Sequence, residues 1–349
     1  MRAKFDNRLR TINMRYVHCL PVVFSSLILG CAVTPEQNEA DLNATLPAMT
    51  LESVLPSAEE NAYCKRHMDS DILYGVGTTL FNDNDVANAK SCLIFAAPEH
   101  NRAFCYLSLI ADRDQQKSQA DRDQESFSYM AYAASQNDWC AEYGMWRVYQ
   151  IGSKGVERDP ELAKRWLERS ALHGYNESQS ALVYRYEADG DLVSSLAWSR
   201  ILGDEQADQQ DQLRQKMDTK QLAASDKLYE RLTKQVTSKE TMYAEAREED
   251  IGRYSATIHL AVPQALDGMN TEQRREFIRE TLAIALENDQ IESREQVALY
   301  MMMTRSARLK GVTTDVLANE QLLAILHNDE LTLAEAQAQA QGVIDATYP

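Results

Sequence analysis

Turn-forming residues and basic residues are both scarce in this sequence. It has 13 glycines and 8 prolines among 349 residues, too few for the many tight turns of an all-β protein. Lysine and arginine total 36 against 53 aspartates and glutamates, so the formal net charge is −17. Because phosphate binding needs a basic surface, this deficit argues against nucleic acid as a partner. The composition favours an all-α protein.

The sequence also lacks the local motifs of common catalytic and metal sites. No His-x-x-x-His, Gly-x-Ser-x-Gly or phosphate-loop pattern occurs. Asp83 and Asp85 resemble a calcium loop only superficially, because the glycine and terminal glutamate of such a loop are absent, and they indicate a polar turn. We interpret His100 and His173 as helix-capping residues, and the acidic run 248–250 as a solvated face. We therefore expect a protein that is not an enzyme and has neither a metal nor a cofactor other than covalent lipid.

A long hydrophobic run is missing as well. The apolar stretch of residues 19–29 is too short to span a bilayer of about 30 Å, but it follows a basic segment and suits a secretory signal. It ends at Gly30 and Cys31, and this ending resembles a bacterial lipobox. The resemblance implies that Cys31 carries lipid, and that Ala32 directs the protein to the periplasmic side of the outer membrane of a diderm bacterium. An ordinary cleaved signal and a buried helix are the alternatives, and the Gly-Cys ending disfavours both.

Cleavage before Cys31 would divide the N-terminal region into two parts. Residues 1–30 form the signal peptide, which contains five basic residues and one acidic residue, so the mature net charge becomes −21. The start codon is either Met1 or Met14, of which Met14 gives the more typical signal length. Residues 31–58 contain three prolines and no aromatic residue, and they predict a flexible tether. A partly helical leader packed on the first repeat is the alternative.

The middle of the chain repeats, with three segments aligned at a spacing of 37 residues and a fourth after a shorter loop. Small side chains recur in fixed columns, and large side chains recur in the column between them. Such columns are typical of helix pairs, because small residues let neighbouring helices approach and aromatic residues fill the remaining space. The columns are Ala89, Ser126, Ala163 and Ser195; Cys92, Tyr129, Trp166 and Trp198; and Ala97, Ala134, Ala171 and Gly203.

One copy of the repeat, residues 141–186, resembles a Sel1-like repeat, a relative of the tetratricopeptide repeat. Its Gly-Val-x-x-Asp loop distinguishes the two families, and Met145, Trp146 and Ser170 depart from the Sel1-like pattern. The resemblance covers about residues 60–235, with one strong copy and about three weak ones, and implies an α-solenoid. The matching positions are Ala141, Tyr149, Gly152, Gly155, Val156, Asp159, Ala163, Trp166, Ala171 and Gly174. Asp159 followed by Pro160 predicts the start of the helix that contains Trp166, and Gly174 predicts its end.

The domain boundaries follow from these patterns. Residues 59–237 are expected to form the solenoid, closed by an amphipathic capping helix in 205–237, although a free amphipathic helix is an alternative. Residues 238–349 predict a mostly helical domain. Within it, the alternation in 253–262 predicts one strand, and the apolar run 297–303 indicates a buried helix whose methionines belong to the core.

Four cysteines remain in the mature chain besides Cys31: Cys64, Cys92, Cys105 and Cys140. An even number in an exported protein indicates disulfides, and three pairings are open. We favour Cys64–Cys92 with Cys105–Cys140, since these join neighbouring helices, and cysteine-stapled secreted members of the Sel1-like family make this plausible. The alternative is that Cys92 and Cys105 are free, buried core residues.

The resemblance implies a non-catalytic scaffold that presents a concave helical face to an unidentified protein in an envelope assembly, secretion or polysaccharide-export complex. The alternatives are a glycan- or peptidoglycan-binding lipoprotein, and an immunity or accessory factor of a secretion system. Residues on the first helix of each pair are the candidates for the concave face. They are Tyr143, Arg147, Gln150, Ser180 and Tyr184.

Overall fold

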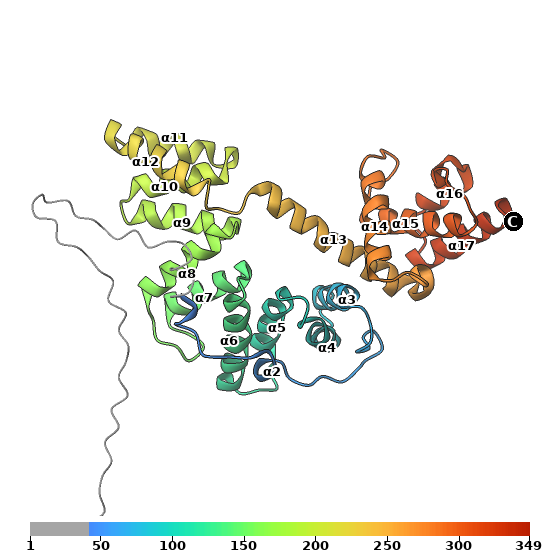
Figure 1. Ribbon diagram of the computed structural model, residues 1–349, viewed down its shortest axis with the longest axis horizontal. Helices are drawn as coiled ribbons and strands as arrows, with labels where there is room; N and C mark the ends of the chain where they lie inside the picture. The colour runs from blue at the N-terminus through green and yellow to red at the C-terminus, as the bar shows by residue number, and fades with distance from the viewer. Residues whose placement is uncertain (1–41) are drawn as a thin grey trace, which may run out of the picture.

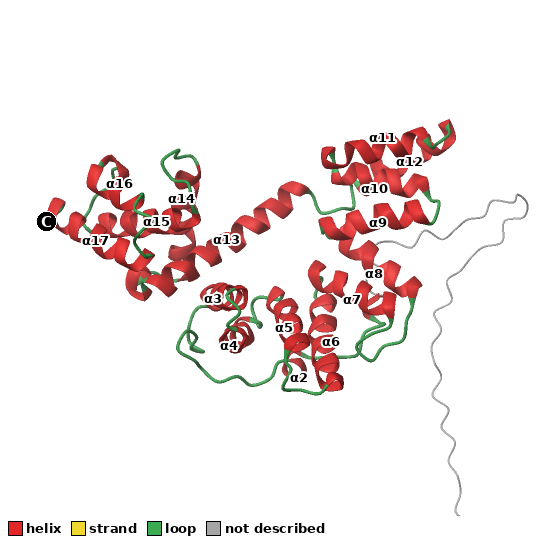
Figure 2. Cartoon of the chain, turned by 180° about the vertical axis from the view of Figure 1, so that it is seen from behind, coloured by secondary structure: helices red, strands yellow, loops and turns green. Residues whose placement is uncertain are grey.

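The computed structural model describes residues 42–349, and this part of the chain is built from sixteen α-helices, α2–α17, with no strand (Figures 1 and 2). The signal peptide, Cys31 and the first part of the expected tether lie outside the described residues. No helix within 42–349 is both long enough and apolar enough to cross a membrane. Because the described residues form helices and no strand, the predicted all-α class is confirmed.

Eight of the helices form four consecutive antiparallel pairs that match the predicted repeats, with each pair packed on the next in chain order (Figure 1). Eleven of the twelve column residues are buried, and the twelfth, Gly203, is half-buried. Ala89, Ser126, Ala163 and Ser195 are inaccessible to solvent, and Trp166 is among the largest fully buried side chains. The pairs are α3 Ser70–Asn82 with α4 Val86–Ala96, α5 Arg102–Arg113 with α6 Gln119–Ser135, α7 Trp139–Ile151 with α8 Pro160–Leu172, and α9 Asn176–Ala188 with α10 Leu192–Leu202.

The strongest repeat copy has the helix ends that its sequence predicts. The Asp159 side chain accepts a hydrogen bond from the backbone N–H of Leu162, and Pro160 occupies the first turn of α8. α8 ends at Leu172 with His173 as its C-cap, and Gly174 then adopts φ +94°, a left-handed conformation that favours glycine. Local sequence thus sets both ends of this helix.

The chain before the first repeat is packed on the body, which corrects the prediction of a flexible tether for residues 42–58. Leu42 is fully buried, and Asn43 accepts a hydrogen bond from Arg169 of α8 at 2.7 Å. The short helix α2, Leu51–Val54, contacts α6. Apolar residues spaced through this segment cover the first core, so the alternative of a packed leader is the one observed.

The region predicted as one capping helix contains two, α11 Ala207–Gln215 and α12 Thr219–Leu232. Asp218 and Gln221 form a capping box that starts α12 afresh. α12 packs along α10 and contributes Leu232 to the core of the last repeats, with Leu228 and Val236 half-buried beside it. These helices cover the end of the row of pairs, as a cap does.

The strand predicted at 253–262 is wrong, because these residues form the C-terminal part of a 23-residue helix, α13 Lys239–Ala261, and the turn after it. This part of α13 is buried on two sides. Ile251, Tyr254 and Ile258 belong to the C-terminal core, whereas Ala256 belongs to the core of the first repeats. A helix covered on two sides carries apolar residues at more positions than a surface helix does, and here they mimic strand alternation.

Four helices follow α13 in the C-terminal unit, and the first two of them contact its end. They are α14 Thr271–Leu286, α15 Arg294–Leu309, α16 Glu320–Leu326 and α17 Leu333–Thr347. Met301, Met302 and Met303 of α15 are all fully buried, so the expectation that the methionines belong to the core is confirmed. Thr332 and Glu335 form the capping box that opens α17.

Candidate binding groove beneath α13

α13 runs from the last repeats back to the first repeat and to the C-terminal unit (Figures 1 and 2). At its start, the Lys239 ammonium donates a hydrogen bond to the Leu202 carbonyl at 2.8 Å, and Met242 packs so closely on Gly174 that a Cβ there would lie 2.8 Å from the Met242 sulfur. The C-terminal half of α13 packs along α3. Residues 243–248 between these contacts are exposed, so α13 is a strut held at both ends.

A cavity of about 680 Å³ lies beneath the strut, between α13 and the N-terminal ends of α3 and α5. Its wall carries more acidic than basic side chains. From the repeats come Asp71, Tyr74, Glu99, His100, Asn101 and Arg102; from α13 and α14 come Thr241, Ala244, Glu245, Glu248, Glu249, Gly252 and Arg275.

Ion pairs connect the three walls of this cavity. Asp71 of α3 lies 3.1 Å from the His100 ring and also pairs with Arg275 of α14. Burial alone would raise the pKa of Asp71, but the hydrogen bonds from His100 and Arg275 outweigh it and lower that pKa to about 2. Arg275 in turn binds Glu248 of α13 at 2.7 Å. The acidic run 248–250, interpreted as a solvated face, is therefore part of the contact between α13 and its neighbours.

A second group of side chains, the aromatic cluster, follows the groove toward the last repeats. The Arg102 guanidinium lies 3.6 Å from the centre of the Trp139 ring, and Trp139 stacks on Tyr175 at 4.5 Å. Tyr143 completes the cluster between Tyr175 and Trp146. These rings stand at the starts of α7 and α9, where they fill the space between adjacent pairs.

The five residues predicted for a concave face differ in their exposure and contacts. Tyr143 belongs to the aromatic cluster, and Gln150 accepts a hydrogen bond from Arg185 at 2.8 Å, so both take part in packing between pairs. Ser180 is half-buried. Arg147 and Tyr184 are exposed, Tyr184 by 59%, and remain available to a partner.

Of the two histidines interpreted as helix caps, only His173 is one. His100 is not, because Ala97 is the C-cap of α4 and Asn101 is the N-cap of α5. His173 is the C-cap residue of α8, and its ring also lies 2.8 Å from the fully buried Glu142 carboxylate. His100 stacks on Tyr74 with ring centres 4.9 Å apart while it contacts Asp71. Sequence reasoning missed this groove because Asp71, His100, Glu248 and Arg275 are separated by up to 204 residues and share no motif.

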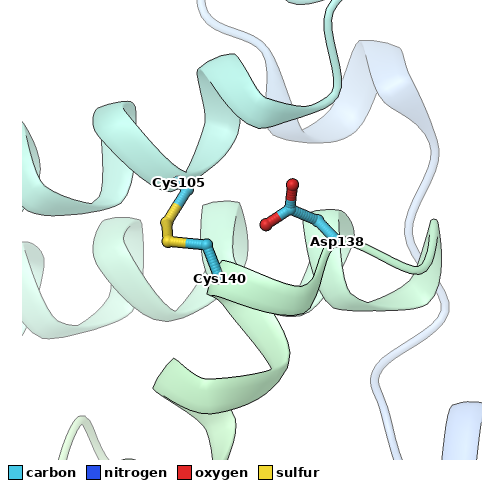
Figure 3. Close-up of side chains that lie close together, drawn as sticks. All are labelled: Cys105, Asp138 and Cys140. Carbon is cyan, nitrogen blue, oxygen red and sulfur yellow. A yellow bond between two sulfur atoms is a disulfide. The ribbon is translucent and has the colours of Figure 1, made fainter. Parts of the chain in front are cut away.

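The cysteines form the two favoured disulfides, Cys64–Cys92 and Cys105–Cys140. Cys105, Cys140 and Asp138 lie together, with potential ligand atoms within 4.8 Å of one another (Figure 3). A disulfide sulfur is not the thiolate that binds metal, and Asp138 already caps α7 and pairs with Arg102. In the oxidised protein this cluster is therefore a structural junction. Asp83 and Asp85 lie in the turn between α3 and α4, at the C-cap and N-cap respectively.

Comparison with known proteins gives no match for this chain. No protein-family model matches it. Neither the curated proteins nor the solved structures contain a significant match.

Proposed function

We propose that the protein is an α-solenoid of Sel1-like repeats that serves as a non-catalytic scaffold for another protein, anchored by lipid to the periplasmic face of the outer membrane. The observation that carries this proposal is the agreement between the sequence columns and the packing of four successive helix pairs. Rows of such pairs form extended surfaces, which repeat proteins use to bind other proteins.

The binding surface we propose is the exposed part of α7 and α9 around Arg147 and Tyr184. These two side chains occupy equivalent positions of adjacent repeats, 37 residues apart. Both are exposed, whereas their counterpart in the preceding repeat, Ile110, is buried. Arginine and tyrosine are also among the residues that contribute most to binding energy at protein interfaces.

Membrane attachment in this proposal depends on Cys31. Residues 32–41 separate that cysteine from the buried Leu42, and an extended chain covers at most about 3.5 Å per residue. Leu42 would therefore stay within about 39 Å of the anchor. The neighbouring Asn43 contacts Ser135 of α6 and Arg169 of α8, so this part of the body would lie nearest to the membrane. The acidic composition gives no attraction to anionic lipid, so lipidation is required.

Crosslinking followed by affinity purification of the lipidated protein tests the scaffold. We expect the wild type to capture a discrete partner, and Arg147→Ala/Tyr184→Ala to lose it without a change in thermal unfolding. Leu309→Ala, a substitution at another exposed side chain, is the control and should retain the partner. Absence of any specific partner with the wild type would contradict the scaffold.

Lipidation is tested separately by labelling with a palmitate analogue. Wild-type protein should incorporate the label and sediment with membranes, whereas Cys31→Ser should do neither. Membrane association of Cys31→Ser at the wild-type level would show that lipid is not the anchor.

The alternative of a glycan-binding protein has one observation in its favour, which is that Tyr184 and Tyr243 are exposed. Glycan stacking, however, needs a free aromatic face. The Trp139 ring already contacts Arg102 of the cavity wall at 3.6 Å and stacks on Tyr175 at 4.5 Å, which leaves little of it free. We therefore place the scaffold first. Nothing in the described residues bears on the immunity or accessory role.

A further inference from the structure

A second cavity, the junction cavity, lies where the start of α13 meets the last repeats (Figure 1). Its volume is about 350 Å³, which suits one large side chain together with its peptide group. Ile201, Val236 and Met242 form an apolar part of the wall and are half-buried, and Tyr243 beside them is 64% exposed. Accessible apolar surface in a concave site is typical of ligand binding.

Gln179 places an unused hydrogen-bond acceptor in this wall. The residue lines the cavity and is only 3% exposed. Its side-chain nitrogen donates a hydrogen bond to the Ala171 carbonyl at 3.0 Å, which fixes the nitrogen and oxygen ends of the amide. The oxygen has no hydrogen-bond partner within residues 42–349, yet it is not among the unpaired atoms that are sealed from solvent. An N–H group of a ligand would satisfy it.

The start of α9 adds unused donors one helical turn before that acceptor. Its N-cap residue, Tyr175, makes no capping hydrogen bond with its side chain. The backbone N–H groups of Asn176 and Glu177 have no acceptor within residues 42–349, and both residues line the cavity with Gln179. A peptide group has one N–H and one carbonyl, so it matches this combination of an acceptor with donors.

The charged groups of the wall favour a basic segment. Glu177 and Glu205 line the cavity, and neither has an ion pair within the described part of the chain. The ammonium of Lys239, which also lines the cavity, already donates a hydrogen bond to the Leu202 carbonyl at 2.8 Å. Acidic residues next to the bound group would be repelled, whereas basic residues there would be attracted.

The junction cavity lies at one end of the surface proposed for partner binding. Asn176, Ser180 and Tyr184 are four residues apart on α9, so their side chains lie in one row along the helix. From Asn176 to Tyr184 this row covers about 12 Å, at a rise of about 1.5 Å per residue. About four residues of extended peptide cover the same distance, so one short segment can contact both places.

We propose that the junction cavity binds a basic peptide segment of the partner through a phenylalanine side chain. The ring packs on Met242 and Tyr243, because sulfur and aromatic groups both make favourable contacts with a ring. The peptide N–H donates to the Gln179 side-chain oxygen, and the peptide carbonyl accepts from the start of α9. Lysine or arginine on either side faces Glu177 and Glu205. The inference rests on the proposed scaffold function, since the peptide belongs to the scaffold's partner.

Fluorescence anisotropy of the full-length protein with the fluorescein-labelled peptide Ala-Lys-Phe-Lys-Ala-amide tests the cavity. We expect saturable binding, and about tenfold weaker binding when alanine replaces the phenylalanine, because the buried apolar contact is lost. Tyr243→Ala should weaken binding of the phenylalanine peptide by a similar factor without lowering the unfolding temperature, since Tyr243 is exposed. Tyr63→Ala, at an exposed tyrosine outside the cavity, is the control and should bind as the wild type does.

A matched pair of charge substitutions tests the basic character of the ligand. Glu205→Gln, in the cavity wall, should weaken binding, whereas Glu330→Gln, an exposed change in the C-terminal unit, should not. No saturable binding, equal binding of the phenylalanine and alanine peptides, or unchanged binding to Tyr243→Ala would overturn the inference. Tighter binding of an N-acetylglucosamine oligomer than of the peptide would also overturn it, in favour of a glycan.

Capture of the partner by crosslinking separates this inference from the scaffold proposal. Loss of capture by both Tyr243→Ala and Arg147→Ala/Tyr184→Ala would support both. Capture that survives Tyr243→Ala but not the double substitution would overturn the junction cavity and leave the scaffold standing. Specific binding of the peptide without capture of any partner would support the cavity and contradict the scaffold.

Discussion

Gly75 of α3 and Gly252 of α13 meet backbone to backbone where the strut crosses the first repeat. A Cβ at Gly75 would lie 2.8 Å from the Gly252 carbonyl oxygen and 2.6 Å from the Ala256 side chain. In the sequence, Gly75 and Gly77 are two isolated glycines within a helical segment. The contact explains why the first of them is a glycine, since only a residue without a side chain lets α13 approach α3 so closely.

Substitution of Gly75 by alanine should therefore loosen the α3–α13 contact. We expect Gly75→Ala to lower the free energy of unfolding by about 1–3 kcal/mol. The clash of the added methyl group destabilises the protein more than the higher helix propensity of alanine stabilises it. Urea unfolding measures this, and limited proteolysis reports whether cleavage within 243–248 increases. Gly342→Ala in α17, where a Cβ meets nothing within 4 Å, is the control and should leave stability equal or slightly higher. Equal behaviour of the two variants would contradict the close contact.

Acid should weaken the junction between the repeats and the C-terminal unit through Asp71. Its pKa is about 2 in the folded protein, below the ordinary value of 3.8. The stabilisation is therefore complete above about pH 4 and is lost as the pH falls through 2. At neutral pH we expect Asp71→Asn to cost about 2 kcal/mol, the free energy that corresponds to this shift.

Measuring unfolding of the wild type and Asp71→Asn between pH 7 and pH 2 checks this prediction. The difference between the two proteins should be constant down to about pH 4 and then shrink. Asp329→Asn changes an exposed residue that has no ion pair among the described residues. Its free energy of unfolding should equal that of the wild type at every pH. A difference that persists unchanged to pH 2 would show that Asp71 acts through packing and not through its charge.

Each disulfide should add measurably to stability. The bridges close chain segments of 28 and 35 residues, for which loss of denatured-state entropy corresponds to about 3–4 kcal/mol. Cys105→Ala/Cys140→Ala and Cys64→Ala/Cys92→Ala should each unfold at lower urea concentration than the wild type. Reductant should have little further effect on a variant that lacks both bridges. Without prior reduction, an alkylating reagent should add no mass at any of these four cysteines. Labelling of any of them would argue against the pairing.

Leu42 distinguishes a packed leader from a flexible tether. Because its side chain is fully buried, Leu42→Ala should lower the free energy of unfolding by about 2–4 kcal/mol. The matched control is Leu309→Ala, which alters a leucine that is 67% exposed and should change stability by less than about 0.5 kcal/mol. If the two substitutions have the same effect, residues 42–58 do not pack on the body in solution.

The sequence alone determined the features that depend on local chemistry and on repetition. Scarce glycine and proline indicated helices, the columns through Ala163 and Trp166 predicted which faces are buried, and Asp159, Pro160 and Gly174 predicted both ends of α8. Of the three pairings that the sequence left open for the cysteines, the favoured one, which joins neighbouring elements, is the one observed. These features need only the period of a helix and the preferences of individual residues.

Tertiary structure decided everything that depends on burial by distant segments. The alternation in 253–262 is compatible with a strand until α13 is seen between two cores, which bury its opposite sides. Residues 42–58 read as a tether because their apolar side chains have no helical period, yet the first repeats bury them. The groove beneath α13 likewise joins Asp71 to Arg275 across 204 residues, a contact that no local pattern encodes because it exists only once the helices have packed.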